Sequence, residues 1–183
     1  MKKRIWINLF FFVLFSLTVL YHAGAAFAAA PADNLNIARL LFVNDVAGLS
    51  QFTPKQGTRF AIGDICRIYL EATGFAMNPT NPDTEDEFEL DLAVDLTIIM
   101  PQGERTVASA PDFHTLQTTF RSRQSTTFLA LNFMFDENWA PGEYIIELTL
   151  RDNLSGQSVT QEMIYQLEEP TEDDRARQAG GRS

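Results

Sequence analysis

The run of residues 88–100 constrains the fold of this chain more than any other segment. Its even positions are apolar from Phe88 to Met100, whereas its odd positions are mostly polar or small, with Ile99 as the exception. A period of two over this length predicts a β-strand with one face in a core and the other in water. On a helix the same apolar residues would be spread around the whole circumference. The segment therefore predicts an antiparallel β-sheet.

The N-terminus has the three parts of a secretory signal peptide. Three basic residues at positions 2–4 precede an apolar run over 5–21, and small residues follow as far as Ala28. We expect this signal helix to be cleaved after Ala28, which would send the mature chain to the periplasm or the extracellular space. The alternative is an uncleaved membrane anchor. The core of the run is shorter than the ~20 apolar residues that a spanning helix needs, and this favours cleavage.

Removal of the signal peptide 1–28 leaves 183 − 28 = 155 residues and changes the formal charge from −10 to −13, because three basic residues are lost. A chain of this length forms one domain that buries ~70% of its unfolded surface without disulfides. Its acidity repels nucleic acid and anionic lipids, so we expect no nucleic-acid partner, and membrane contact only if the signal segment is retained. Cys66 is the single cysteine and lies among apolar residues. It therefore predicts a buried, unreactive thiol.

Short strand patterns recur along the rest of the chain. After a flexible lead at 29–35 we expect a β-domain over 36–168 and a disordered, charged tail over 169–183. The expected strands are 37–43, 58–62, 65–73, 88–100, 105–108, 116–123, 126–135, 143–151 and 159–167. The segment 116–123 is polar and rich in threonine, as expected of an exposed edge. About seven to nine strands without helices between them predict an all-β, antiparallel, immunoglobulin-like β-sandwich.

The C-terminal hairpin carries a resemblance to known folds. Residues 140–144 (Ala-Pro-Gly-Glu-Tyr), an alternating strand and the loop 152–156 (Asp-Asn-Leu-Ser-Gly) follow one another. This sequence resembles the final hairpin of exported bacterial immunoglobulin-like and fibronectin-III-like domains. The resemblance implies a fold and not a function. It also implies that Tyr144 forms a tyrosine corner, with its ring in the core and its hydroxyl bonded to nearby backbone.

Motifs for catalysis are missing from the mature sequence. His114 is its one histidine, and we expect a loop residue without a role, because no second histidine or cysteine pair exists to share a metal. Neither a Gly-x-Ser-x-Gly motif nor a glycine-rich phosphate loop is present. Glu89, Asp91 and Asp95 share the water-facing side of the predicted strand 88–100. We expect solvated carboxylates there, and a hydrolase that uses them is the least favoured interpretation.

The acidic segment 78–87 offers oxygen ligands that Ca²⁺ prefers. The candidate ligands are Asn81, Asp83, Glu85, Asp86 and Glu87. No glycine stands where an EF-hand needs one, so we expect a mobile surface loop and no cofactor, with Ca²⁺ as the weaker alternative.

Trp139 is the one tryptophan of the mature chain and follows Asp136 and Asn138 in a turn. On an exposed loop tip these three residues could bind a sugar or anchor a partner. Packing of Trp139 against the sandwich is the competing interpretation.

The leading interpretation is therefore an exported, non-enzymatic β-sandwich that binds another exported or envelope protein, or a cell-surface component. A carbohydrate-binding module that uses Trp139 is the alternative. Exposed aromatic rings on one sheet face would favour glycan binding. A smooth polar surface with one exposed sheet edge would favour protein binding by strand addition.

Overall fold

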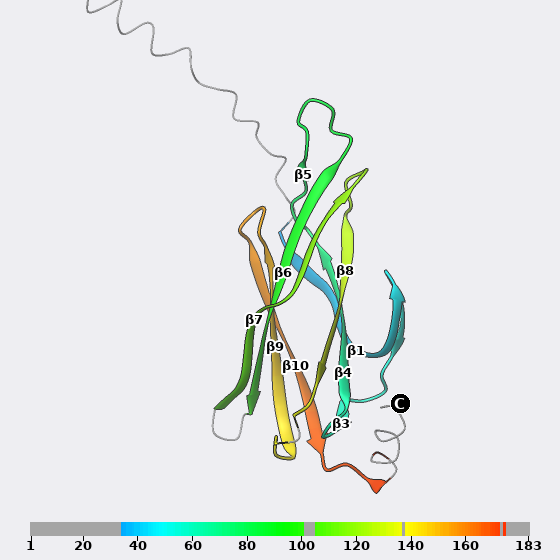
Figure 1. Ribbon diagram of the computed structural model, residues 1–183, viewed down its shortest axis with the longest axis vertical. Coiled ribbons are helices and arrows are strands. Elements are labelled where there is room, and N and C mark those ends of the chain that lie inside the picture. The colour runs from blue at the N-terminus through cyan, green and yellow to red at the C-terminus, as the bar shows by residue number, and fades with distance from the viewer. Residues whose placement is uncertain (1–33, 101–104, 137, 173, 175–183) are drawn as a thin grey trace, which may run out of the picture. The chain divides into compact units, whose positions relative to one another are not determined.

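The computed structural model describes residues 34–100, 105–136, 138–172 and 174 (Figure 1). The expected signal peptide 1–28, the first part of the lead and most of the tail lie outside the described residues, as do residues 101–104 between two expected strands. No helix in the described part of the chain is long and apolar enough to cross a membrane.

Ten strands make up the described part of the domain. They are β1 (Asn36–Gly48), β2 (Gln51–Pro54), β3 (Arg59–Ala61), β4 (Ile65–Thr73), β5 (Asn78–Pro79), β6 (Phe88–Met100), β7 (Arg105–Phe120), β8 (Thr126–Met134), β9 (Gly142–Asp152) and β10 (Ser158–Glu168). One sheet has the order β2-β1-β4-β8, and the other has the order β3-β10-β9-β6-β5, with β7 paired to β6 (Figure 1). Among the described pairs only β3 and β10 are parallel. The predicted antiparallel, immunoglobulin-like sandwich is confirmed.

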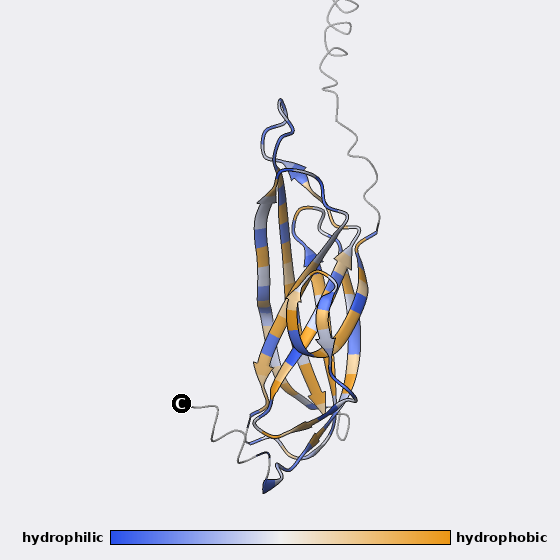
Figure 2. Ribbon diagram, turned by 90° about the vertical axis from the view of Figure 1, so that its right-hand side faces the viewer, coloured by the Kyte–Doolittle hydropathy of each residue, from blue (hydrophilic) through white to orange (hydrophobic). Residues whose placement is uncertain are grey.

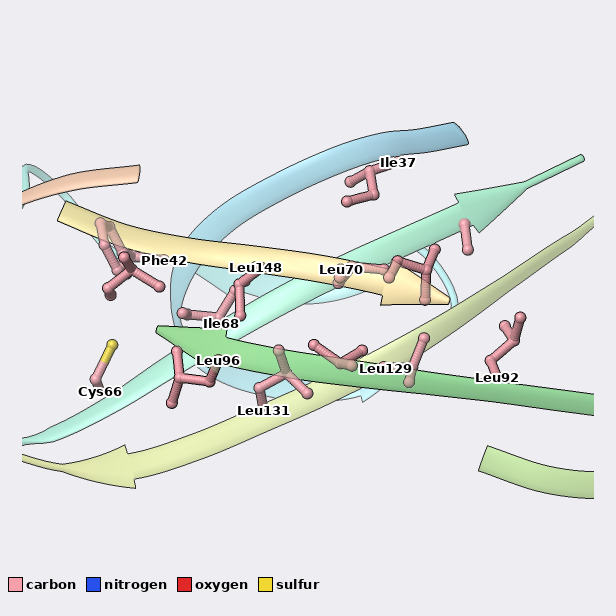
Figure 3. Packing of buried hydrophobic residues seen from close by; sticks show 14 of the residues in the cluster. Ile37, Phe42, Cys66, Ile68, Leu70, Leu92, Leu96, Leu129, Leu131 and Leu148 are labelled. Carbon is pink, nitrogen blue, oxygen red and sulfur yellow. The ribbon is translucent and has the colours of Figure 1, made fainter. Parts of the chain in front are cut away.

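The core lies between the two sheets and is built by alternation along the strands (Figure 2). On β6 the even-numbered residues face inward, and Leu96 lies opposite Leu148 of β9. Figure 3 shows β1, β4 and β8 supplying the other half of the core through Ile37, Phe42, Ile68, Leu70, Leu129 and Leu131. Cys66 is fully buried in this cluster, and burial raises the pKa of its thiol, as expected of an unreactive cysteine.

The corner residue Tyr144 behaves as the resemblance implied. Its side chain is fully buried, and its hydroxyl donates a hydrogen bond of 2.7 Å to the backbone carbonyl of Ala140 in the preceding turn. This bond ties the start of β9 to the loop that leads into it.

β7 is longer than the sequence indicated. We predicted two short strands, 105–108 and 116–123, but β7 is one strand that pairs with β6 along its length. The register shifts between Val94 and Leu96 of β6, where a bulge around residues 111–113 places Asp112 at a φ of 50°. Pro111 and this bulge interrupt the alternation by which a strand is recognised. His114 therefore lies on β7 and not in a loop.

The ends of the domain also differ from the prediction. Leu35, which we placed in the flexible lead, is buried, and its N–H donates to the side-chain oxygen of Gln157 at 2.9 Å. At the other end, the side chains of Thr171 and Asp174 accept hydrogen bonds from each other's backbone N–H groups, as in a helix capping box. The first described residues of the expected tail therefore carry hydrogen bonds of their own. The sequence did not predict either contact, because local composition does not show which distant or nearby residue serves as the hydrogen-bond partner.

A hairpin absent from the prediction covers part of the first sheet's outer face. Tyr69 of β4 alternates with the inward-facing Ile68 and Leu70, yet it is fully buried. The ring of Phe52 on β2 lies 4.5 Å from the Tyr69 ring, and the backbone N–H of Ser50 donates to the Tyr69 hydroxyl at 2.9 Å. The hairpin of the long β1 and the short β2 thus covers the part of this face that surrounds Tyr69 and shields it from solvent.

Candidate functional site

The carboxylates of β6 are bonded to neighbouring strands. Asp95 accepts two hydrogen bonds from the Arg151 guanidinium of β9, both at 3.0 Å, and one from the backbone N–H of Asp112 at 2.8 Å. Arg151 also pairs with the Asp112 carboxylate. The hydrogen bonds from Arg151 lower the pKa of Asp95. The group fastens the bulge of β7 to β6 and β9.

Asp91 is bonded in a similar way, with 2.8 Å hydrogen bonds from the side-chain amides of Gln117 and Asn153. The carboxylates that we expected to be solvated thus also have hydrogen-bond partners at Asp91 and Asp95, while Glu89 is exposed. These bonds explain the groups as cross-strand ties on an open sheet face. Polar residues with such partners cannot be separated from solvated ones by sequence period alone.

The acidic loop is organised by bonds of its own. The Asn81 carbonyl accepts from the N–H of Glu85 at 3.0 Å, and the Asn81 side-chain oxygen accepts from the N–H of Asp83 at 3.0 Å. The Asp86 carboxylate accepts from the Thr84 hydroxyl at 2.6 Å. The five predicted ligands, Asn81, Asp83, Glu85, Asp86 and Glu87, are all exposed. No group of three or more His, Cys, Asp or Glu side chains in the described ranges is arranged to hold a metal ion.

Trp139 lies against the end of the core. Its ring stacks on Tyr144 with centroids 5.8 Å apart, and its centroid is 6.0 Å from that of Phe135. Asp136 accepts hydrogen bonds of 2.7 Å from both the backbone and the side-chain nitrogen of Asn138. The three predicted residues are thus neighbours, but they form a turn with a half-buried indole rather than an open aromatic platform.

β10 leaves one edge of the second sheet unpaired. It pairs with β9 from Ser158 to Leu167, whereas on its other side β3 reaches only residues 166–168. The N–H of Gln166 donates to the Thr58 carbonyl on that outer side. Residues two apart in a strand direct their backbone groups the same way, so Thr160, Glu162 and Ile164 face outward too. Within the described residues, these three backbone positions have no strand partner on the outer side.

An open groove of about 400 Å³ runs beside this edge, between the two sheets. It is lined by Leu40, Leu41 and Phe42 of β1, by Pro54, Lys55, Gly57 and Thr58, and by Met163 and Ile164 of β10. The Gln161 side chain bridges to the Ile37 carbonyl at 3.1 Å at one end, and the bond from Gln166 to Thr58 closes the other. Five residue steps separate these closures, about 17 Å of strand.

Gly57 takes a left-handed φ of 74° in the turn between β2 and β3. On β10 the Ile164 side chain is 55% exposed. The sequence predicted β10 but not this edge. The alternation of Val159, Met163 and Tyr165 identifies a strand, while its neighbours depend on distant parts of the chain.

No protein-family model matches the chain, and no curated protein matches it. Solved structures do match. An alkylpurine DNA glycosylase from Pseudomonas fluorescens, bound to DNA with an abasic site analog, has a TM-score of 0.43 and 9% identity over 74% of this chain, which spans only 31% of that protein. The C-terminal domain of wzt has a TM-score of 0.43 and 7% identity, with 78% of each chain covered.

An immunoglobulin-like protein from Pseudomonas aeruginosa has a TM-score of 0.35 and 11% identity, and the match covers 76% of this chain and 100% of that one. None of these similarities carries an argument about function. The assignment of an immunoglobulin-like β-sandwich rests on the strand order of the chain itself.

Proposed function

We propose that this chain is an exported, non-enzymatic binding module that takes up an extended segment of another exported or envelope protein by strand addition to β10. The observation that carries the proposal is the unpaired backbone of Thr160, Glu162 and Ile164 beside the open groove. A strand laid along this edge gains main-chain hydrogen bonds, and its alternate side chains enter the groove.

The two edge strands of the second sheet differ in how they are protected against pairing with another chain. This difference supports β10 as the binding edge. Exposed edge strands invite pairing with other chains unless proline, bulges or charges protect them. β7, the opposite edge, contains Pro111 and a bulge that Arg151 fastens in place. β10 pairs with β9 in continuous register from Ser158 to Leu167 and contains no proline. Glu162 is the one charged residue of its free stretch, whereas β7 has both a proline and a bulge.

Export is the second part of the proposal and rests on the signal-peptide pattern of residues 1–28. Cleavage after Ala28 leaves Ala29 as the first residue of the mature chain. N-terminal sequencing of the protein recovered from the periplasm or the medium tests this directly. A chain recovered with an intact Met1 in the membrane fraction would show an anchor instead.

Site-specific photo-crosslinking in the exporting cell tests strand addition. A photoreactive residue at Ile164 should give a discrete adduct, whereas residues at Asn132 on β8 and Thr119 on β7 should not. Asn132 is the informative control, because β8 also ends its sheet. Adducts from Asn132 and none from Ile164 would show that the partner binds at β8, and this would contradict strand addition to β10.

Thr160→Pro removes one outward backbone N–H and should abolish the Ile164 adduct, since proline is tolerated on an edge strand but cannot donate to an added one. Thr160→Val is the matched control. Both variants lose the 2.8 Å bond between the Thr149 and Thr160 hydroxyls, but valine keeps the N–H. Equal adduct yields from the two folded variants would contradict strand addition.

A further inference from the structure

Two glutamates lie side by side on the outer face next to the free edge. Glu162 of β10 is directly opposite Glu147 of β9 in the strand register. Like charges in this cross-strand position repel each other. The ion pairs of the described residues are Arg39–Glu71, Arg59–Glu168, Arg151–Asp95 and Arg151–Asp112. None of them supplies a cation to Glu147 or Glu162, so the pair is uncompensated in this part of the chain.

An apolar row borders the acidic pair. Ile164 lies opposite Ile145, which lies opposite Ile99 of β6, so three isoleucines cross the outer face of the sheet in register. A strand added to β10 would meet this row through Ile164. Its outward side chains would therefore face, in turn, an apolar residue, an acid and a threonine.

The groove side of the same edge has a different character. Leu40, Phe42 and Met163 line it, so alternate side chains of an added strand meet apolar walls. Lys55 also lines the groove, and its amine lies 4.7 Å from the centroid of the Phe60 ring. This cation belongs to the groove, whereas the pair formed by Glu147 and Glu162 belongs to the outer face of the sheet.

We infer that the captured strand carries a lysine or arginine at the position facing Glu162, with apolar residues at the alternate, groove-facing positions. This inference rests on the proposed strand addition and specifies the chemistry of the partner. A cation opposite Glu162 adds an attractive cross-strand pair that offsets its repulsion by Glu147. The formal net charge of −10 acts in the same direction during approach.

Binding of short synthetic peptides to the mature chain tests the charge preference. The probe is the capped, fluorescein-labelled peptide Ser-Ile-Val-Lys-Val-Ile-Ser, which is palindromic and so presents the same pattern in either strand direction. A second peptide has glutamate in place of lysine. Fluorescence anisotropy should give at least tenfold tighter binding of the lysine peptide.

Charge reversal at the edge provides the decisive comparison. Glu162→Lys should reverse the preference, so that the glutamate peptide binds more tightly. Glu89→Lys makes the same change in net charge at an exposed outer-face position of β6 and should leave the preference with the lysine peptide. Circular dichroism and urea melts establish that both variants are folded. If the preference for the lysine peptide changed equally in both variants, it would depend on net charge rather than on Glu162, and the inference would be overturned.

The outcomes separate this inference from the proposed function. Equal binding of both peptides, abolished by Thr160→Pro, would refute the charge preference and leave strand addition intact. Failure of both peptides to bind, while the Ile164 adduct in cells stays sensitive to Thr160→Pro, would also refute only the inferred chemistry. Loss of that sensitivity in cells would refute the proposed function itself.

Discussion

Two buried tyrosines in the core, Tyr144 and Tyr165, stack on each other with centroids 5.3 Å apart, but their hydroxyl groups have different surroundings. The Tyr144 hydroxyl donates to the Ala140 carbonyl, whereas the Tyr165 hydroxyl is buried without a hydrogen-bond partner among the described residues. Burial raises the pKa of Tyr165, which favours the neutral hydroxyl. The same change to phenylalanine should therefore have different effects at the two sites.

Tyr144→Phe removes a 2.7 Å bond and should lower the free energy of unfolding by about 1–2 kcal/mol. Tyr165→Phe removes a polar group that lost its water on folding and gained nothing in return. Because desolvating such a group costs about 1–3 kcal/mol, its removal should be neutral or should raise stability by about 1 kcal/mol.

Urea denaturation of the mature chain at pH 7, followed by tryptophan fluorescence, measures both variants on one scale. The denaturation midpoint of Tyr144→Phe should fall, whereas that of Tyr165→Phe should stay unchanged or rise. The slopes should be unchanged, because neither variant alters the surface exposed on unfolding. If Tyr165→Phe destabilised the chain as much as Tyr144→Phe, the Tyr165 hydroxyl would have a hydrogen-bond partner. The premise that it is buried without one would then be wrong.

Four further variants test other contacts. Leu96→Asp should lower stability by about 4 kcal/mol or more, since it places a charge in the core. Thr97→Asp on the outer face should cost at most about 1 kcal/mol, through repulsion from Glu147 directly opposite it, and equal urea midpoints for the two variants would disprove the inward facing of Leu96. Asp152→Ala should cost about 3 kcal/mol, because the buried carboxylate accepts from the N–H groups of Ala76 and Leu154, and a thermal melt unchanged from the wild type would rule this out. Asp95→Asn should cost about 1 kcal/mol at pH 7. Arg151 lowers the pKa of Asp95 in the folded state. The stabilisation is therefore fully present above the unfolded-state pKa of about 4 and is lost as the pH falls through the lower folded-state pKa. A stability difference between wild type and Asp95→Asn that grew on acidification would contradict this pH dependence.

The strands with regular alternation were predictable from sequence because each one reports its own buried face. The patterns of β6 and β9 are unbroken, and their predicted bounds agree with the structure to within one residue. β7 was not predictable as one strand, because the bulge at Asp112 shifts the side-chain alternation in the middle of the element. The period of a sequence describes a strand only where its register is continuous.

The candidate site was not predictable for a different reason. Its residues are ordinary strand and loop residues, and the site consists of backbone groups that have no strand partner in the described part of the chain. Whether Glu162 has a neighbour depends on where Thr58 and Ile37 lie, more than a hundred residues earlier in the chain. In contrast, three side chains that the sequence offered as candidates, Trp139, Asp91 and Asp95, have structural partners in the fold.

Hydrogen exchange at single residues of β10 tests the central claim most directly. In the free chain the amides of Thr160 and Glu162 should exchange rapidly, while those of Gln161 and Met163, which face β9, should be protected. In the complex purified through its Ile164 cross-link, strand addition should slow exchange at Thr160 and Glu162 and leave Gln161 and Met163 unchanged. Rapid exchange of Thr160 and Glu162 in that complex would show that the partner does not pair with β10.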